Sequence, residues 1–156
     1  MKRVNSFGSW TEDSDVRHFS GNAKYEIEFD IPAVYLGEGR VLWPDLGNVT
    51  DASKVWLNGR EAGITWKRPH RHEVTRWAQP GNNFLEVRVS NRLINTVSGM
   101  KKPDWADRVV EKYAGYNERH LWCEIVVREY GYQDLPAAGL LGPARLVPMR
   151  ELEISV

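Results

Sequence analysis

The stretch Lys54–Trp66, KVWLNGREAGITW, carries the clearest indication of fold in this sequence. Asn58-Gly59 separates two short runs that are rich in β-branched and aromatic residues. Both residues of such a pair tolerate positive φ, which a two-residue hairpin turn of type I′ requires. The stretch therefore predicts two antiparallel strands, at residues 54–57 and 61–66.

Alternation of apolar and polar residues predicts further strands on both sides of this hairpin. Residues 24–31 alternate strictly, with apolar Tyr25, Ile27, Phe29 and Ile31. This period of two is typical of a strand with one buried face and one solvent-exposed face. The same pattern recurs at residues 84–90. Shorter patterns predict strands at residues 40–46, 72–77, 121–128 and 145–156, and Pro148 places the last of these at a sheet edge or beside a bulge.

About eight short strands separated by turn residues predict an all-β, antiparallel sandwich or barrel. Residues 91–120 form a long insertion between two of these strands, and its segment Asp104–Tyr113, DWADRVVEKY, has near-helical spacing. The sequence therefore predicts one short helix within the insertion. Because 156 residues fit one domain of ordinary size, we expect a single domain over residues 1–156.

The charge balance argues against several classes of function. The chain has 21 basic and 21 acidic residues and a formal net charge of zero. A protein that binds nucleic acid or a membrane surface through a general basic field carries an excess of cations, so neither partner is expected, and the balance suits an uncharged ligand. No apolar run approaches the roughly 20 residues that span a bilayer. No apolar stretch follows Met1-Lys2-Arg3, so we expect no signal peptide in this chain.

Motifs for catalysis or metal binding are weak. The sequence has no glycine-rich phosphate loop, no His-Glu-x-x-His and no paired-cysteine zinc pattern. His70 and His72 could supply two metal ligands from one side of a strand, but nothing nominates the others. Residues 12–15, EDSD, leave a structural calcium ion open, beside the alternative of a solvated acidic turn. A glycosidase pair needs two carboxyl groups ~5–10 Å apart across a sugar-sized cleft, which a small sandwich rarely provides. We therefore expect no catalytic residue and no required cofactor.

Seven tryptophans give the chain its aromatic character. Trp43 and Trp56 lie inside predicted strands and are expected to fill the core. Trp66 precedes the polar run 67–71, KRPHR. Sugars commonly bind to an aromatic ring through their C–H surface, with Arg, Asn and His side chains bonding to the hydroxyl groups in a site of modest size. The predicted carbohydrate-binding residues are Trp66 as the platform, with Arg68, His70, Arg71 and Asn91 as polar partners.

Several motifs in a fixed order resemble a known family. They are Ser9–Asp13 (SWTED), Phe19–Tyr25 (FSGNAKY), Asp45–Val49 (DLGNV), Val55–Arg60 (VWLNGR) with Gly63, Trp66 and Pro69, Pro80–Val87 (PGNNFLEV) and Gly139–Pro143 (GLLGP). Together they resemble the galactose-binding-domain-like β-sandwich of large glycoside hydrolases. The closest likeness is to the domain near the C-terminus of bacterial family 106 α-L-rhamnosidases. The sugar-binding domain of family 2 enzymes, of β-galactosidase and β-glucuronidase type, is similar but more distant.

The resemblance extends from about Ser9 to Leu146 and implies a jelly-roll sandwich. It implies a non-catalytic carbohydrate-binding or ancillary domain, beside a catalytic barrel that this chain does not contain. The implied partners are that barrel and a plant cell-wall or pectin-like glycan, and the implied parent is exported to the periplasm or the exterior. Two alternatives stay open. One is a purely structural packing domain of the parent enzyme, and the other is a small stand-alone enzyme that acts on a carbohydrate with His70 or His72 as its base.

Overall fold

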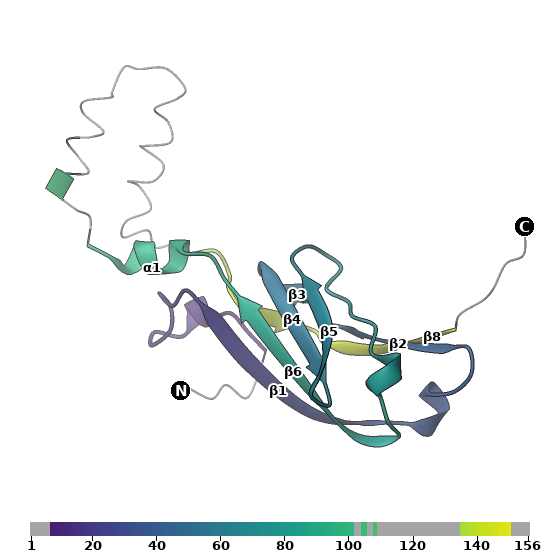
Figure 1. Cartoon of the computed structure of the whole chain (residues 1–156). Helices are drawn as coiled ribbons and strands as arrows, with labels where there is room; N and C mark the ends of the chain where they lie inside the picture. The colour runs from purple at the N-terminus through teal and green to yellow at the C-terminus, as the bar shows by residue number, and fades with distance from the viewer. Residues whose placement is uncertain (1–6, 102–103, 106–107, 109–134, 151–156) are drawn as a thin grey trace, which may run out of the picture. The chain divides into compact units, whose positions relative to one another are not determined.

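The computed structural model describes residues 7–101, 104–105, 108 and 135–150 (Figure 1). The strands in this part of the chain are β1 (Asn22–Ile31), β2 (Arg40–Asp45), β3 (Asn48–Val49), β4 (Ala52–Leu57), β5 (Arg60–Thr65), β6 (Gly81–Ser90), β7 (Leu140–Gly142) and β8 (Arg145–Arg150). The helical elements are α1 (Ile94–Gly99) and the 3-10 turns η1 (Trp10–Glu12), η2 (Ala33–Tyr35) and η3 (Thr75–Trp77). All strand pairs within the sheets are antiparallel, so the predicted all-β class is confirmed.

The largest sheet has the strand order β1-β6-β4-β5. One row of paired residues crosses it: Thr65 of β5 lies opposite Ser53 of β4, which lies opposite Val89 of β6, which lies opposite Ala23 of β1. Because β5 and β6 both end next to this row, Trp66 and Asn91 leave the sheet at the same end.

The predicted hairpin is present between β4 and β5. Asn58 and Gly59 have φ values of 50° and 76°, as a two-residue turn of type I′ requires. The Asn58 side chain also makes three bonds outside the hairpin: its Oδ1 accepts the Phe84 N–H at 2.8 Å, and its Nδ2 donates to the Trp77 carbonyl at 2.9 Å and to Asn83 Oδ1 at 2.8 Å. The turn is therefore tied to the start of β6.

A second layer contains β2, which pairs with β8 along one side. Residues 70–74 run along its other side, where the Leu46 N–H donates to the His70 carbonyl at 2.9 Å and the Val74 N–H donates to the Leu42 carbonyl at 3.0 Å. The side chain of His70 points the other way, to Ser53 and Thr65 of the large sheet. The two layers thus face each other across residues 70–72, and β3 pairs with β7 in a separate two-stranded sheet.

The strand predicted at residues 72–77 is wrong. Only Arg71 forms a bridge, to Asp45, and Thr75–Trp77 curl into the 3-10 turn η3. The reason is the Thr75 side chain, whose Oγ1 accepts the Leu42 N–H at 2.9 Å. This hydroxyl takes the place of the backbone carbonyl that a longer strand would offer to β2. The chain then turns, with the Trp77 N–H donating to the Val74 carbonyl at 2.9 Å.

The core lies between the layers, and Trp43 and Trp56 are not in it. The fully buried residues of these strands include Leu42 of β2, Val55 and Leu57 of β4 and Val87 of β6. Because successive side chains of a strand point to opposite faces, Trp43 and Trp56 point outward and are half-buried. Their expected burial in the core is therefore wrong.

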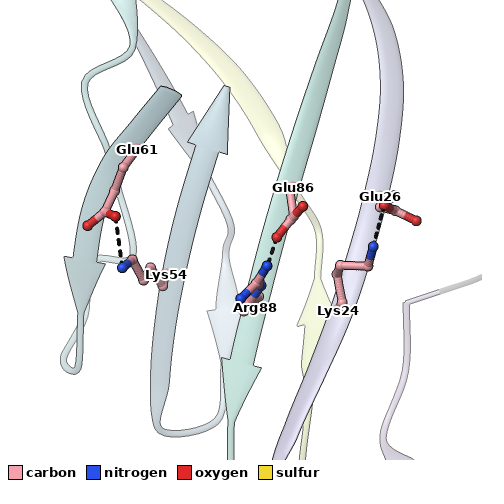
Figure 2. A network of polar contacts seen from close by, with 6 residues as sticks. All are labelled: Lys24, Glu26, Lys54, Glu61, Glu86 and Arg88. Carbon is pink, nitrogen blue, oxygen red and sulfur yellow. Dashed lines mark hydrogen bonds and ion pairs between the residues drawn. The ribbon is translucent and has the colours of Figure 1, made fainter. Parts of the chain in front are cut away.

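The outer face of the large sheet is charged, and its charges pair with one another (Figure 2). The ion pairs are Lys24–Glu26 at 2.6 Å, Lys54–Glu61 at 2.8 Å and Arg88–Glu86 at 2.7 Å. Trp56 lies among them, with Lys54 Nζ 4.9 Å and the Arg88 guanidinium 4.7 Å from its ring centroid. This face is typical of a solvated sheet surface with balanced charge.

The described residues separate into two compact units. The larger unit contains residues 7–9, 22–91 and 138–150, and the smaller contains residues 10–21, 92–101, 104–105, 108 and 135–137. In the smaller unit, Trp10 packs edge-to-face on Phe19 with ring centroids 5.6 Å apart, and His18 Nδ1 lies 3.1 Å from Ser98 Oγ of α1. The single domain predicted over residues 1–156, and its jelly-roll connections, stay predictions.

Other sequence predictions fall partly outside the described residues. Of the helix predicted at 104–113, the described residues Asp104, Trp105 and Arg108 are helical. The helix α1 at 94–99 was not predicted. The strand predicted at 121–128 lies outside the described residues. Among the residues that are described, no helix is long and apolar enough to cross a membrane.

Candidate functional site

The residues that follow β5 form an exposed surface on the larger unit. Residues 66–71 run beside residues 45–48, and two side-chain contacts join these stretches: Arg68 donates to Asn48 Oδ1, and Arg71 Nε donates to Asp45 Oδ2 at 2.8 Å. We call the surface made by Asn48, Trp66, Lys67, Arg68 and Arg71 the Trp66 face.

Trp66 is the most exposed aromatic residue on this surface, with 73% of its area accessible. The Lys67 ammonium lies over its ring, 5.6 Å from the centroid, at the distance of a cation–π contact. Tryptophan combines a large apolar ring with a polar N–H group and is enriched at contact surfaces that are partly in water. Trp66 therefore has the exposure that a stacking platform needs.

The two arginines of the Trp66 face are held in place by acceptors from neighbouring strands. Asp45 lies at the end of β2. Its carboxylate forms an ion pair with the Arg71 guanidinium and accepts a hydrogen bond from the Gly47 N–H at 2.9 Å. Burial would raise the pKa of Asp45, but these hydrogen bonds and the charges of Arg71 and Arg145 outweigh it and lower the pKa below its usual value. The carboxylate is thus charged at neutral pH and orients Arg71.

His70 is placed differently from the prediction. Its ring is only 2% exposed, and its Nδ1 lies 3.1 Å from Ser53 Oγ and 3.0 Å from Thr65 Oγ1. His72 is 4% exposed, with its Nε2 3.3 Å from the same Thr65 hydroxyl. The two imidazoles do share one side of their segment, as predicted, but that side faces the interior. Both rings are thus buried in this structure, and the sugar-binding role of His70 and the base role of either histidine stay predictions.

Asn91 comes directly after β6 and is half-buried at the end of the sheet that also carries Trp66. The strands β5 and β6 are separated by β4, so two strand spacings, about 10 Å, divide their ends. That distance is comparable to a disaccharide. The binding roles predicted for Trp66, Arg68, Arg71 and Asn91 stay predictions.

The sequence reasoning missed Asp45 and Asn48. Both lie in the stretch DLGNV, which contributed to the family resemblance, but nothing local indicates that residues 45–48 meet residues 66–71. The contact is set by the β2 pairing with residues 70–74, which is a long-range feature.

No metal centre is found in the described part of the chain, where no group of three or more His, Cys, Asp or Glu side chains is arranged to hold an ion. In the acidic turn at residues 12–15, Asp13 Oδ1 accepts the Asp15 N–H at 3.1 Å, which is a local turn contact. The structural calcium ion left open by the sequence is not tested by this arrangement.

The buried histidines lead to a prediction on pH. Burial, followed by the neighbouring His70, lowers the pKa of His72 from 6.5 to about 4. The unfolded chain therefore takes up the proton first as the pH falls, so the folded state loses stability between pH 6.5 and 4. At pH 5 the loss relative to pH 7.5 is expected to be about 2 kcal/mol, because each pKa unit corresponds to about 1.4 kcal/mol. Burial of His70, followed by the charge of Arg68, lowers its pKa and acts in the same direction, and Asp45 opposes it.

Urea unfolding at pH 7.5 and pH 5 measures this loss, and His72→Gln is the control. The variant removes one of the two titrating rings, so its free energy of unfolding should depend less on pH whatever its absolute stability. An equal pH dependence in both proteins would mean that His72 is not buried in its neutral form.

Comparison with known proteins relates the chain to segments of much longer enzymes. No protein-family model matches it. A protein of Formosa agariphila named "Putative beta-glucuronidase" is 30% identical over an alignment 162 residues long, which covers 92% of this chain and 14% of that protein. The chain thus spans about a seventh of that relative.

Two solved structures share the fold. A rhamnosidase from Novosphingobium sp. PP1Y aligns with 94% of this chain and 13% of its own, at 28% identity and a TM-score of 0.67. The beta-glucuronidase of Ruminococcus gnavus, solved with uronic isofagomine, aligns with 56% of this chain and 16% of its own, at 26% identity and a TM-score of 0.51. The proteins that this chain resembles are therefore glycoside hydrolases, and the likeness covers a small part of each.

Proposed function

We propose that this chain is a non-catalytic carbohydrate-binding or ancillary domain of a polysaccharide-degrading glycoside hydrolase with an α-L-rhamnosidase-like parent. Its fold would be the galactose-binding-domain-like jelly roll of the family 106 enzymes. Its partners would be a plant cell-wall or pectin-like glycan and the catalytic barrel of the parent. The likeness to one segment of a rhamnosidase over 94% of this chain supports the parent assignment.

The observation that carries the binding role is the exposed Trp66 with its flanking guanidinium groups. An indole at 73% exposure offers a flat apolar surface to the C–H face of a pyranose ring. Arg68 and Arg71 lie in the same loop and are oriented by Asn48 and Asp45, so they are placed to donate to sugar hydroxyls. Binding needs only a few convergent polar groups of this kind.

Calorimetric titration of the full 156-residue chain tests this proposal, with rhamnose, galactose and pectin fragments as ligands. A monosaccharide of about a dozen non-hydrogen atoms, at roughly 0.3 kcal/mol per atom, binds with a Kd near 1 mM. We expect that value for the preferred sugar and tighter binding for oligomers that also reach Asn91. If none of these ligands releases or absorbs heat at millimolar concentration, the binding role is wrong.

A purely structural packing domain is the second candidate, and the outer face of the β2–β8 pair favours it. In this pair Trp43 lies opposite Val147, and Val41 lies opposite Met149, which is 37% exposed. All four are apolar, whereas the outer face of the large sheet carries ion pairs. A strand with apolar residues on both faces is typically covered on both. The catalytic barrel of the parent would be the cover, since six-sevenths of the Formosa relative lies outside the matched segment. A domain that only packs in this way would bind none of the glycans in the titration.

A further inference from the structure

We propose that the glycan bound at the Trp66 face is anionic, so that its carboxylate or sulfate groups are recognised by Lys67 and Arg68. This inference rests on the proposed function and names the chemical class of its ligand. It departs from the uncharged partner that the net charge of zero suggests.

The local charge differs from that of the whole chain. The stretches 45–51 and 66–71, with the neighbouring Arg145, contain four cations: Lys67, Arg68, Arg71 and Arg145. The same stretches contain two carboxylates, Asp45 and Asp51. Burial and the charge of Arg68 lower the pKa of His70, which leaves its ring neutral at pH 7. These two stretches, with Arg145 opposite Asp45, therefore carry a net charge of four minus two, or +2.

The cations of this surface also differ in how they are paired. Arg71 is neutralised by Asp45. Arg68, in contrast, donates to the neutral amide oxygen of Asn48, and Lys67 contacts the Trp66 ring. No carboxylate among the described residues lies within ion-pair distance of either Lys67 or Arg68. On the outer face of the large sheet, by comparison, Lys24, Lys54 and Arg88 each have a carboxylate partner (Figure 2).

The geometry of these two cations suits an anionic sugar. Asn48 holds one guanidinium nitrogen of Arg68, and the planar group can present its remaining N–H donors to a carboxylate or sulfate as a two-pronged contact. Lys67 keeps its ammonium next to the ring on which the sugar would stack. A uronic acid or a sulfated sugar would thus place its apolar face on Trp66 and its anion between two unpaired cations. A neutral sugar would make the stacking contact with Trp66 but not the contact with the two cations.

Titration of the full chain with matched oligosaccharides tests the inference. One arm compares an oligogalacturonate with its fully methyl-esterified form, which has the same backbone without the charge. A second arm compares a sulfated oligogalactan with its desulfated form. In 20 mM salt we expect the charged member to bind about tenfold more tightly in at least one arm, as two exposed charge-assisted contacts would give. That ratio should fall several-fold in 0.5 M salt. The arm that shows the preference identifies the anion as carboxylate or sulfate.

Two double variants with the same change of net charge provide the control. Lys67→Gln/Arg68→Gln should reduce the charged-to-neutral affinity ratio to near one. Lys54→Gln/Arg88→Gln removes two cations from the outer face and should leave the ratio unchanged. Equal affinities for charged and neutral members in the wild-type chain would overturn this inference and leave the proposed function standing. An equal fall of the ratio in both variants would also overturn it, since the preference would then reflect net charge. Absence of binding in all arms would refute the proposed carbohydrate-binding role itself.

Discussion

Replacing Trp66 by alanine is expected to abolish measurable sugar binding while the fold stays intact. The side chain is 73% exposed, so its removal creates no cavity and should change the free energy of unfolding by less than about 0.5 kcal/mol. Loss of the ring removes the stacking surface, which should weaken binding at least about tenfold and move a millimolar Kd out of range. Calorimetric titration of wild type and variant with the same pectin fragment measures the difference.

Ile64→Ala is the matched control for this experiment. Ile64 lies two residues before Trp66 in the chain and is 62% exposed, so its truncation removes an exposed apolar group without an aromatic ring. We expect its affinity to stay within about twofold of wild type. The stacking role of Trp66 fails if Trp66→Ala binds as tightly as wild type, or if both variants weaken binding equally.

Replacing Asn58 by alanine is expected to cause the largest loss of stability among the exposed turns. Asn58 has a φ of 50°, which costs about 1–2 kcal/mol for an alanine. Its side-chain amide also makes hydrogen bonds to the Phe84 N–H, the Trp77 carbonyl and Asn83 Oδ1. Removing the hydrogen-bond partner of buried polar groups costs about 1–3 kcal/mol. Asn83 is buried, so water replaces this partner poorly. The expected total is a loss of about 2–5 kcal/mol in the free energy of unfolding, measured by urea unfolding.

Asn58→Gly separates the two contributions, because glycine adopts positive φ without strain but makes no side-chain bonds. We expect Asn58→Gly to lie between wild type and Asn58→Ala, by about 1 kcal/mol or more from each. If Asn58→Ala unfolds within 0.5 kcal/mol of wild type, the amide does not tie the hairpin to β6 as described. Equal losses in the two variants would assign the whole effect to the side-chain bonds.

Local patterns predicted much of the fold. The Asn58-Gly59 turn and the alternation in β1 and β6 depend only on neighbouring residues, and the structure has all three where they were expected. The strand expected at 72–77 failed because the Thr75 hydroxyl bonds to Leu42, some thirty residues away. A contact between residues so far apart in the sequence cannot be predicted from the local alternation of apolar and polar residues.

The candidate site was predictable in its residue types more than in its geometry. Trp66 is exposed as a platform requires, but the same reasoning placed His70 beside it, and the ring of His70 packs into the interior. Side-chain alternation explains both: in an extended segment Arg71 points to solvent, so His70 and His72 point inward. The same rule puts Trp43 and Trp56 on outer faces opposite the buried Leu42 and Val55. The contacts of Asp45 and Asn48 with Arg71 and Arg68 depend on strand pairing, which the local sequence does not indicate.

The central claim is that carbohydrate binds at the Trp66 face, and one NMR titration tests it most directly. The full chain, with its seven tryptophans labelled at the indole nitrogen, is titrated with a pectin fragment, and Trp66 is identified by its absence in Trp66→Phe. We expect a saturable shift of the Trp66 indole signal, with Trp43 unchanged because it lies on β2, in the other layer. A Trp66 signal that stays fixed at millimolar ligand, or a shift of Trp43 alone, would contradict this claim.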